Sequence, residues 1–169
     1  QMIESGITTV MHNHSLERLP PNATVYNSSA RIIQAYEESG MRVAFSLSRR
    51  DQNELLYEED AEFRTILPAK LAQEVKVHLD SRPTSTEDYL SICAELYENN
   101  QSEKTNIFIS PHNVHTCSET LLQEIRKFAT RHSMGIHIHL QETPYQKMYG
   151  IRHWGKTPLA HLYDLGFLG

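Results

Sequence analysis

The sequence predicts an α/β fold with a parallel β-sheet. Short apolar runs typical of buried strands recur along the chain, and segments with helical periodicity separate them. Strands are expected at residues 6–11, 41–47, 106–109 and 135–140. Because strands that alternate with helices form βαβ units, these strands are expected to lie parallel in one sheet. No strand is followed by a G-x-G-x-x-G, P-loop or G-x-S-x-G sequence, so dinucleotide binding has no support.

Cap residues and helix breakers define the expected helices. Ser28 is the expected N-cap of a helix that ends at Gly40, after a loop over residues 12–27. Thr116 and Glu119 have the spacing of a capping box, which predicts a helix running to about residue 132. Other helices are expected at residues 69–79, 86–98 and 158–164, with a charged surface segment at 48–68 and a loop around Trp154.

Length and composition exclude several classes of protein. The chain has 169 residues, is 39% hydrophobic and 22% charged, and fits one globular domain with a real core. Its net charge of −5 argues against nucleic acid or an anionic membrane as the main partner. No apolar run approaches the ~20 residues of a spanning helix, and no signal peptide is recognisable. Because the first residue is Gln1, we expect the chain to be cut from a longer protein.

The two cysteines predict a reducing environment. Cys93 and Cys117 lack C-x-x-C spacing, so neither a disulfide framework nor a thiolate zinc site is expected, and the cytoplasm is the expected location. Cys117 precedes a predicted helix, whose N-terminus favours a thiolate, but simple packing is the preferred interpretation.

The most informative motif is H-I-H-L-Q-E-T, residues 137–143. Strand side chains alternate between faces, so His137 and His139 share one face, and Glu142 follows three residues after the second. Neutral imidazole is the commonest metal ligand, and a nearby carboxylate is the usual acid/base for metal-bound water. Two interpretations stay open from these residues alone. The motif is part of a metallohydrolase centre, or it is a strand end with hydrogen-bonded histidines and a solvated glutamate.

Histidines follow two other strands. His112 comes just after the strand at residues 106–109, which places it on the same sheet rim as Glu142. It is expected to hydrogen-bond a substrate, the alternative being a loop histidine without a role. His12 and His14 are expected just after the first strand. No third metal ligand lies nearby in the sequence. For His14, contact with the substrate or with a metal-binding side chain is therefore preferred over direct binding of the metal.

Four segments together resemble the amidohydrolase superfamily. They are G-I-T-T-V at residues 6–10, G-M-R at 40–42, P-H-x-x-x-x-C-S at 111–118 and H-x-x-E-T at 139–143, and they occur in the family's order over essentially the whole chain. The first segment is weakly specific, whereas the last two are strongly specific in combination. The branch that the chain resembles contains deaminases and chlorohydrolases of nitrogen heterocycles, including adenosine-type and S-adenosylhomocysteine-type deaminases.

The resemblance implies a fold, a cofactor and residue roles. Members of this family are (β/α)8 barrels with one divalent metal ion, zinc with iron as the alternative. By resemblance, His139 is the metal ligand on the fifth barrel strand, Glu142 is the catalytic carboxylate that shuttles protons, and His112 binds the substrate. His137 is not a ligand in the family pattern, so a supporting position behind the site is expected for it. The implied reaction is hydrolysis of a carbon–nitrogen bond other than a peptide bond, or dechlorination, on a heterocyclic ring.

The family pattern requires more than these residues. An upstream H-x-H pair, a later histidine and a later aspartate are absent, and a full barrel has ~250 residues. Residues 1–169 are therefore expected to be a fragment of a barrel domain, covering roughly strands two to five, with most metal ligands elsewhere. One ligand does not hold a catalytic zinc, which usually has three, so the fragment alone is expected to be inactive and to bind metal weakly. Its unpaired sheet edges favour self-association as a homo-oligomer.

Two other functions remain open at this stage. A non-catalytic barrel relative would bind a small molecule without a metal centre. An independent α/β interaction module would resemble the family only by descent.

Overall fold

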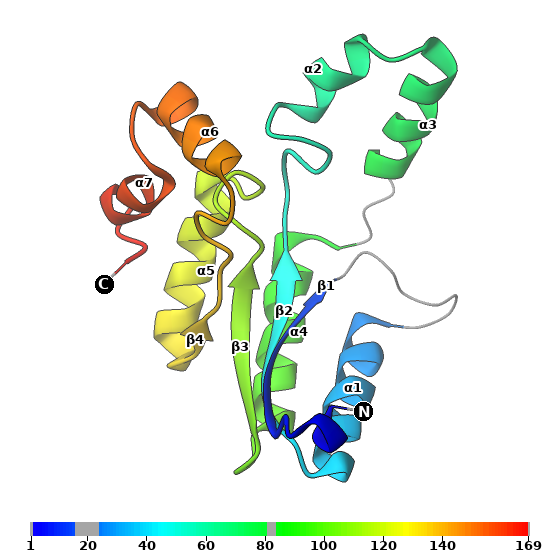
Figure 1. Ribbon diagram of the computed structural model, residues 1–169, viewed down its shortest axis with the longest axis vertical. Coiled ribbons are helices and arrows are strands. Elements are labelled where there is room, and N and C mark those ends of the chain that lie inside the picture. The colour runs from blue at the N-terminus through cyan, green and yellow to red at the C-terminus, as the bar shows by residue number, and fades with distance from the viewer. Residues whose placement is uncertain (1, 16–23, 81–83, 169) are drawn as a thin grey trace.

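The computed structural model describes residues 2–15, 24–80 and 84–168, and it confirms a parallel α/β sheet (Figure 1). The sheet has four strands in the order β1-β2-β3-β4, and each neighbouring pair is parallel. The strands are β1 (Thr9–Ser15), β2 (Arg42–Arg49), β3 (Thr105–Pro111) and β4 (Gly135–Ile136). Because all neighbouring strands are parallel, their carboxyl ends meet at one rim of the sheet.

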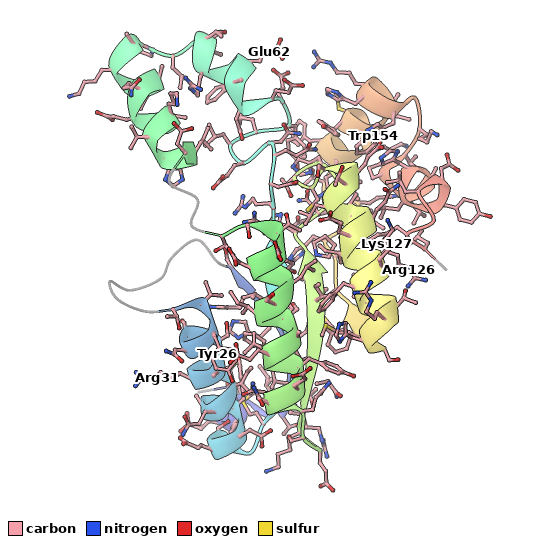
Figure 2. All side chains as sticks on the ribbon, turned by 180° about the vertical axis from the view of Figure 1, so that it is seen from behind. Tyr26, Arg31, Glu62, Arg126, Lys127 and Trp154 are labelled. Atoms are coloured by element: carbon pink, nitrogen blue, oxygen red, sulfur yellow. The ribbon has the colours of Figure 1, made fainter. Side chains whose placement is uncertain are left out.

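Helices connect the strands and pack against the sheet. They are α1 (Val25–Ser39), α2 (Asp60–Thr65), α3 (Ala69–Asp80), α4 (Thr86–Asn100), α5 (Glu119–His132), α6 (Pro144–Trp154) and α7 (Pro158–Asp164), and a short 3-10 turn, η1 (Ile3–Ser5), precedes β1. Figure 2 shows α1, α4 and α5 in front of the sheet, with Lys127 on the outer surface of α5. These helices form the layer that covers one face of the sheet.

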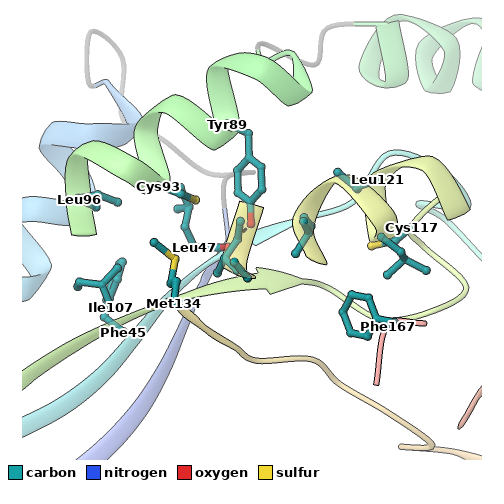
Figure 3. Close-up of a cluster of buried hydrophobic side chains, with 14 of the residues drawn as sticks. Phe45, Leu47, Tyr89, Cys93, Leu96, Ile107, Cys117, Leu121, Met134 and Phe167 are labelled. Atoms are coloured by element: carbon teal, nitrogen blue, oxygen red, sulfur yellow. Dashed lines mark hydrogen bonds between the residues drawn. The ribbon is translucent and has the colours of Figure 1, made fainter. Parts of the chain in front are cut away.

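The core lies between this helical layer and the sheet (Figure 3). Phe45 and Leu47 of β2 and Ile109 of β3 are almost fully buried, as are Leu96 of α4 and Leu121 of α5. Buried apolar side chains supply the main favourable free energy of folding, so this layer fixes where the strands end. In the part of the chain that the structure describes, no helix is both long and apolar enough to cross a membrane.

The first strand lies three residues later than the sequence predicted. The expected strand at residues 6–11 is wrong at both ends, because β1 pairs with β2 from Thr9 to Ser15. His12 and His14 therefore lie within the strand and not in the loop after it. Much of the predicted loop over residues 12–27 falls at 16–23, outside the described residues.

Two predicted N-caps are wrong by a few residues. Thr24, not Ser28, caps α1, because its side chain accepts a hydrogen bond from the backbone N–H of Asn27 at 3.1 Å. Ser118, not Thr116, caps α5. Gly40 ends α1 as predicted, with a φ of 77° that favours glycine.

The last strand is shorter than predicted. β4 covers only Gly135–Ile136, but backbone hydrogen bonds continue the pairing beyond it. His137 N donates to Ile109 O at 2.9 Å, and His139 N donates to His112 O at 3.1 Å. The H-x-H motif is therefore still tied to the end of β3, even though its backbone leaves regular strand geometry.

Two segments differ from the expected loops. The charged segment at 48–68 leads into the α2–α3 hairpin, which projects from the carboxyl end of β2 (Figure 1) and has no buried residue in either helix. The expected loop around Trp154 is wrong, since Trp154 is the last residue of α6. This helix begins directly after Thr143, its N-cap residue, so it constrains the backbone that follows the H-x-x-E-T motif at residues 139–143.

Candidate functional site

Polar side chains from β1, β2 and the segment after β4 meet on the sheet face opposite the core. Asn13 of β1 is paired in register with Ser46 of β2, and both side chains reach the H-x-H motif. Asn13 Nδ2 lies 3.0 Å from His139 Nε2, and Ser46 Oγ lies 3.1 Å from His137 Nδ1. Ser46 Oγ also donates to Asn13 Oδ1 at 3.2 Å. His137 and His139 therefore share one face, as the sequence predicted, and a hydrogen-bonded chain connects them.

This group fits one corner of a metal centre and not a whole one. An amide nitrogen only donates, so His139 Nε2 accepts the Asn13 N–H on its lone pair, and Nε2 would ligate a metal only in place of this hydrogen bond. A catalytic zinc usually has three protein ligands. Among residues 2–15, 24–80 and 84–168, no group of three or more His, Cys, Asp or Glu side chains is arranged to hold a metal ion.

His112 lies beside His139 at the end of β3. Their ring centroids are 5.6 Å apart, and His112 Nδ1 lies 3.3 Å from Thr116 Oγ1. Burial, together with the charges of Arg50 and His139, lowers the pKa of His112 to about 4, although the Glu142 carboxylate raises it. The imidazole is therefore neutral at pH 7, and with Nδ1 paired to Thr116 its Nε2 offers either a donor or an acceptor to a bound molecule.

Glu142 stands at the same rim, after the paired part of the chain has ended. Its side chain is exposed, and its backbone N–H donates to Oε1 of Gln146 at 3.2 Å. Its charge raises the pKa of His112, against the effect of burial. The structure thus brings His137 and His139 together, with His112 beside His139, and leaves the Glu142 side chain exposed three residues beyond His139.

His14 is not brought to this group. Its ring lies 5.8 Å from Phe45 and 5.7 Å from His12, on the face that carries the core. Side chains alternate along β1, so His14 and Asn13 point to opposite faces. A contact between His14 and a substrate stays a prediction that this geometry does not favour.

Sequence reasoning missed Asn13 and Ser46. Asn13 lies between the two histidines that attracted attention, and it was placed in a loop because the first strand was predicted to end too early. The available signal was the alternation itself: once β1 includes residues 12–14, Asn13 must face away from His12 and His14. Ser46 is a small polar residue within an apolar strand, and such a residue marks the face that does not join the core.

A comparison with protein families decides the identity of this fold. The model of the family described as "Amidohydrolase family" matches residues 1–169. The chain belongs to the amidohydrolase family. Among curated relatives of this amidohydrolase, a 5-methylthioadenosine/S-adenosylhomocysteine deaminase of Thermococcus kodakarensis is 40% identical over 75 residues, which is 44% of this chain and 18% of the relative.

Solved structures show the same fold at low identity. An adenosine deaminase from Xanthomonas campestris with bound zinc has a TM-score of 0.66 and 20% identity, covering 99% of this chain and 30% of its own. An atrazine chlorohydrolase from Arthrobacter aurescens complexed with zinc has a TM-score of 0.67 and 18% identity, and the match covers 98% of this chain and 33% of the chlorohydrolase chain. The amidohydrolase chain thus has the fold of part of a (β/α)8 barrel, as predicted, and it spans about a third of the length of these structures.

Proposed function

We propose that this chain is part of a metal-dependent hydrolase that removes an amino or chloro group from a nitrogen heterocycle. The observation that carries the proposal is that His112 lies beside His139 at the rim, with Glu142 three residues further along, in a chain of the amidohydrolase family. The matched deaminases and chlorohydrolase support this class of reaction. Residues 1–169 would contribute a segment of the barrel domain, with further ligands from the rest of the protein.

In this proposal each residue has a distinct task. His139 would hold one divalent ion, zinc in view of the zinc-bound relatives, with iron as the alternative. The ion would supply a hydroxide at neutral pH by lowering the pKa of water toward ~7. Glu142 would take the proton from the attacking water and deliver it to a ring nitrogen or the leaving group. His137, hydrogen-bonded to Ser46, would support the ligand strand from behind.

The substrate class is proposed from the matched relatives and from His112. With Nδ1 paired to Thr116, the Nε2 of His112 would make one hydrogen bond to a heterocyclic ring, which itself presents donor and acceptor edges. The matched relatives named for methylthioadenosine, adenosine and atrazine support ring substrates of this kind. We propose no nucleic-acid or membrane partner, and a cytoplasmic location in keeping with two free cysteines. The outer edges of β1 and β4 would pair with further barrel strands or with a second copy.

Two substitutions in the full-length protein test this assignment. Glu142→Gln should lower turnover by at least about 100-fold, the contribution of a general acid/base, while bound zinc stays nearly unchanged. His139→Ala should lower both zinc content and turnover. Ammonia release from adenine nucleosides, chloride release from a chlorotriazine and elemental analysis provide the measurements. Glu124→Gln, at an exposed glutamate on α5, is the matched control for loss of a carboxylate.

The outcomes separate enzyme from non-catalytic relative. Equal loss of zinc in the Glu142→Gln and His139→Ala proteins would contradict the separate roles. A wild-type protein that binds adenine nucleosides but contains no metal and releases neither product would support the non-catalytic alternative.

A further inference from the structure

The backbone that carries Glu142 is not held by the sheet. The last backbone hydrogen bond between the motif and β3 joins His139 N to His112 O, three residues before the carboxylate. Gln141, between them, has a φ of 55°, in the left-handed region that a glutamine rarely adopts. The turn therefore depends on side-chain contacts to keep one geometry.

Gln146 supplies the first of these contacts. It lies in the first turn of α6, is only 2% exposed, and accepts the Glu142 N–H on Oε1 at 3.2 Å. Its Nε2 is also buried but finds no hydrogen-bond partner among the described residues. A buried amide with an unsatisfied donor destabilises a fold, and an apolar side chain would pack there without this penalty. Stability alone therefore does not account for glutamine at this position, whereas holding the Glu142 backbone does.

Tyr57 supplies the second contact, from a different segment. Its hydroxyl lies 3.0 Å from Oγ1 of Thr143, the N-cap residue of α6 and the neighbour of Glu142. Its ring stacks on His115, with centroids 4.2 Å apart and planes 24° apart. His115 is itself fixed, because its carbonyl accepts a hydrogen bond from Asn53 Nδ2 at 2.8 Å. Tyr57 thus connects the turn to the loop that follows β3, through its hydrogen bond to Thr143 and its stacking on His115.

We propose that Tyr57 and Gln146 are positioning residues that hold the Glu142 carboxylate at the rim. The inference rests on the proposed function, since it gives that carboxylate its task. The two residues hold the turn from two different segments: Gln146 of α6 binds the Glu142 backbone, and Tyr57, before α2, binds the side chain of Thr143. Neither contact involves His139, so their loss should leave the metal ligand in place.

Variants of the full-length enzyme test this with kinetics. Gln146→Leu removes the acceptor, Gln146→Glu keeps an acceptor oxygen, and Tyr57→Phe removes only the hydroxyl. Because a small misplacement of a reacting group lowers the rate strongly, kcat for adenine-nucleoside deamination should fall about tenfold or more in Gln146→Leu and Tyr57→Phe. KM and zinc content should change less than about twofold, and Gln146→Glu should keep most of kcat. Tyr163→Phe, at a tyrosine that is 71% exposed on α7, is the matched control.

Amide hydrogen exchange tests the same inference without catalysis. The Glu142 amide should exchange at least about tenfold faster in Gln146→Leu and Tyr57→Phe, while the Ile109 amide of β3 keeps its protection. If the wild-type protein releases neither ammonia nor chloride from these substrates, the proposed function fails, and exchange alone decides this inference. An unchanged Glu142 amide, or a fall in zinc content that matches the fall in kcat, would overturn it. Tyr57→Phe removes one oxygen atom, so it keeps the test available if Gln146→Leu does not fold.

Discussion

Removal of the Tyr89 hydroxyl should loosen the rim that carries the candidate site. Tyr89 of α4 is fully buried, and its hydroxyl reaches between two strands. It donates to Leu47 O of β2 at 2.9 Å and accepts from Ser110 N of β3 at 3.3 Å. Ser110 lies two residues before His112, so this hydroxyl joins the helical layer to the end of the strand that presents a site residue.

The size of the effect follows from burial. Tyr89→Phe keeps the ring and removes both hydrogen bonds, and its partners stay buried away from water. A buried group that loses its partner destabilises a protein by about 1–3 kcal/mol, so we expect the free energy of unfolding to fall by about 2 kcal/mol. For a chain of this size, that change corresponds to a fall in Tm of roughly 4–8 °C.

Urea unfolding and thermal unfolding measure this change. Far-ultraviolet circular dichroism reports the loss of helix and sheet, and the midpoint shift at constant m-value gives the difference in free energy. Tyr163→Phe, which removes the same atom from an exposed ring, should change the free energy of unfolding by less than about 0.5 kcal/mol. If Tyr89→Phe behaves like this control, the hydroxyl does not hold the strand ends, and the argument from its contacts is wrong.

Three further predictions follow from named contacts. Cys93 and Cys117 should react with a thiol reagent at pH 8 only after unfolding, because burial raises the pKa of each thiol to about 12; rapid labelling of the native protein would contradict this. Asp51→Ala should lower the free energy of unfolding by about 1–3 kcal/mol in a urea titration, since the carboxylate accepts from Ser118 N at 2.7 Å and Ser118 Oγ at 2.6 Å; no change would mean that water replaces these bonds. His112→Ala should raise KM at least as much as it lowers kcat in steady-state kinetics, and an unchanged KM would count against substrate binding.

The sheet was predictable from sequence because its strands carry apolar side chains that are buried against the helical layer. Val43, Phe45 and Leu47 alternate into the core, and this pattern identified β2 within two residues of its ends. β1 has no such run at its carboxyl end, where His12 and His14 occupy the core-facing positions. Two histidines at core-facing positions look like a loop in sequence, so the strand was predicted to stop early.

Helix α6 was missed because its buried side is not apolar. Its buried residues are Gln146, Tyr149 and Gly150, while Met148 and Ile151 are exposed, which reverses the pattern that periodicity detects. Gly150 is buried for a specific reason, since a Cβ there would lie 2.7 Å from Pro158 Cδ. Long-range contacts of this kind leave no periodic signal in the sequence.

The site itself shows what a local motif determines and what it leaves to its neighbours. The spacing of H-I-H-L-Q-E-T was enough to predict that His137 and His139 share one face, because alternation along an extended chain is a local property, whereas the end of β4 was not predicted. The protonation form of His139 is not local. It is set by Asn13, more than one hundred residues earlier in the chain, whose amide N–H requires a lone pair on Nε2 and thereby leaves the ring proton on Nδ1. Asn13 is in turn oriented by Ser46, which donates to its Oδ1. β1 and β2 therefore set the tautomer of this histidine within the chain, but the Nε2 lone pair is engaged by Asn13, and binding an ion there would require that hydrogen bond to be replaced as well as further ligands that these residues do not supply.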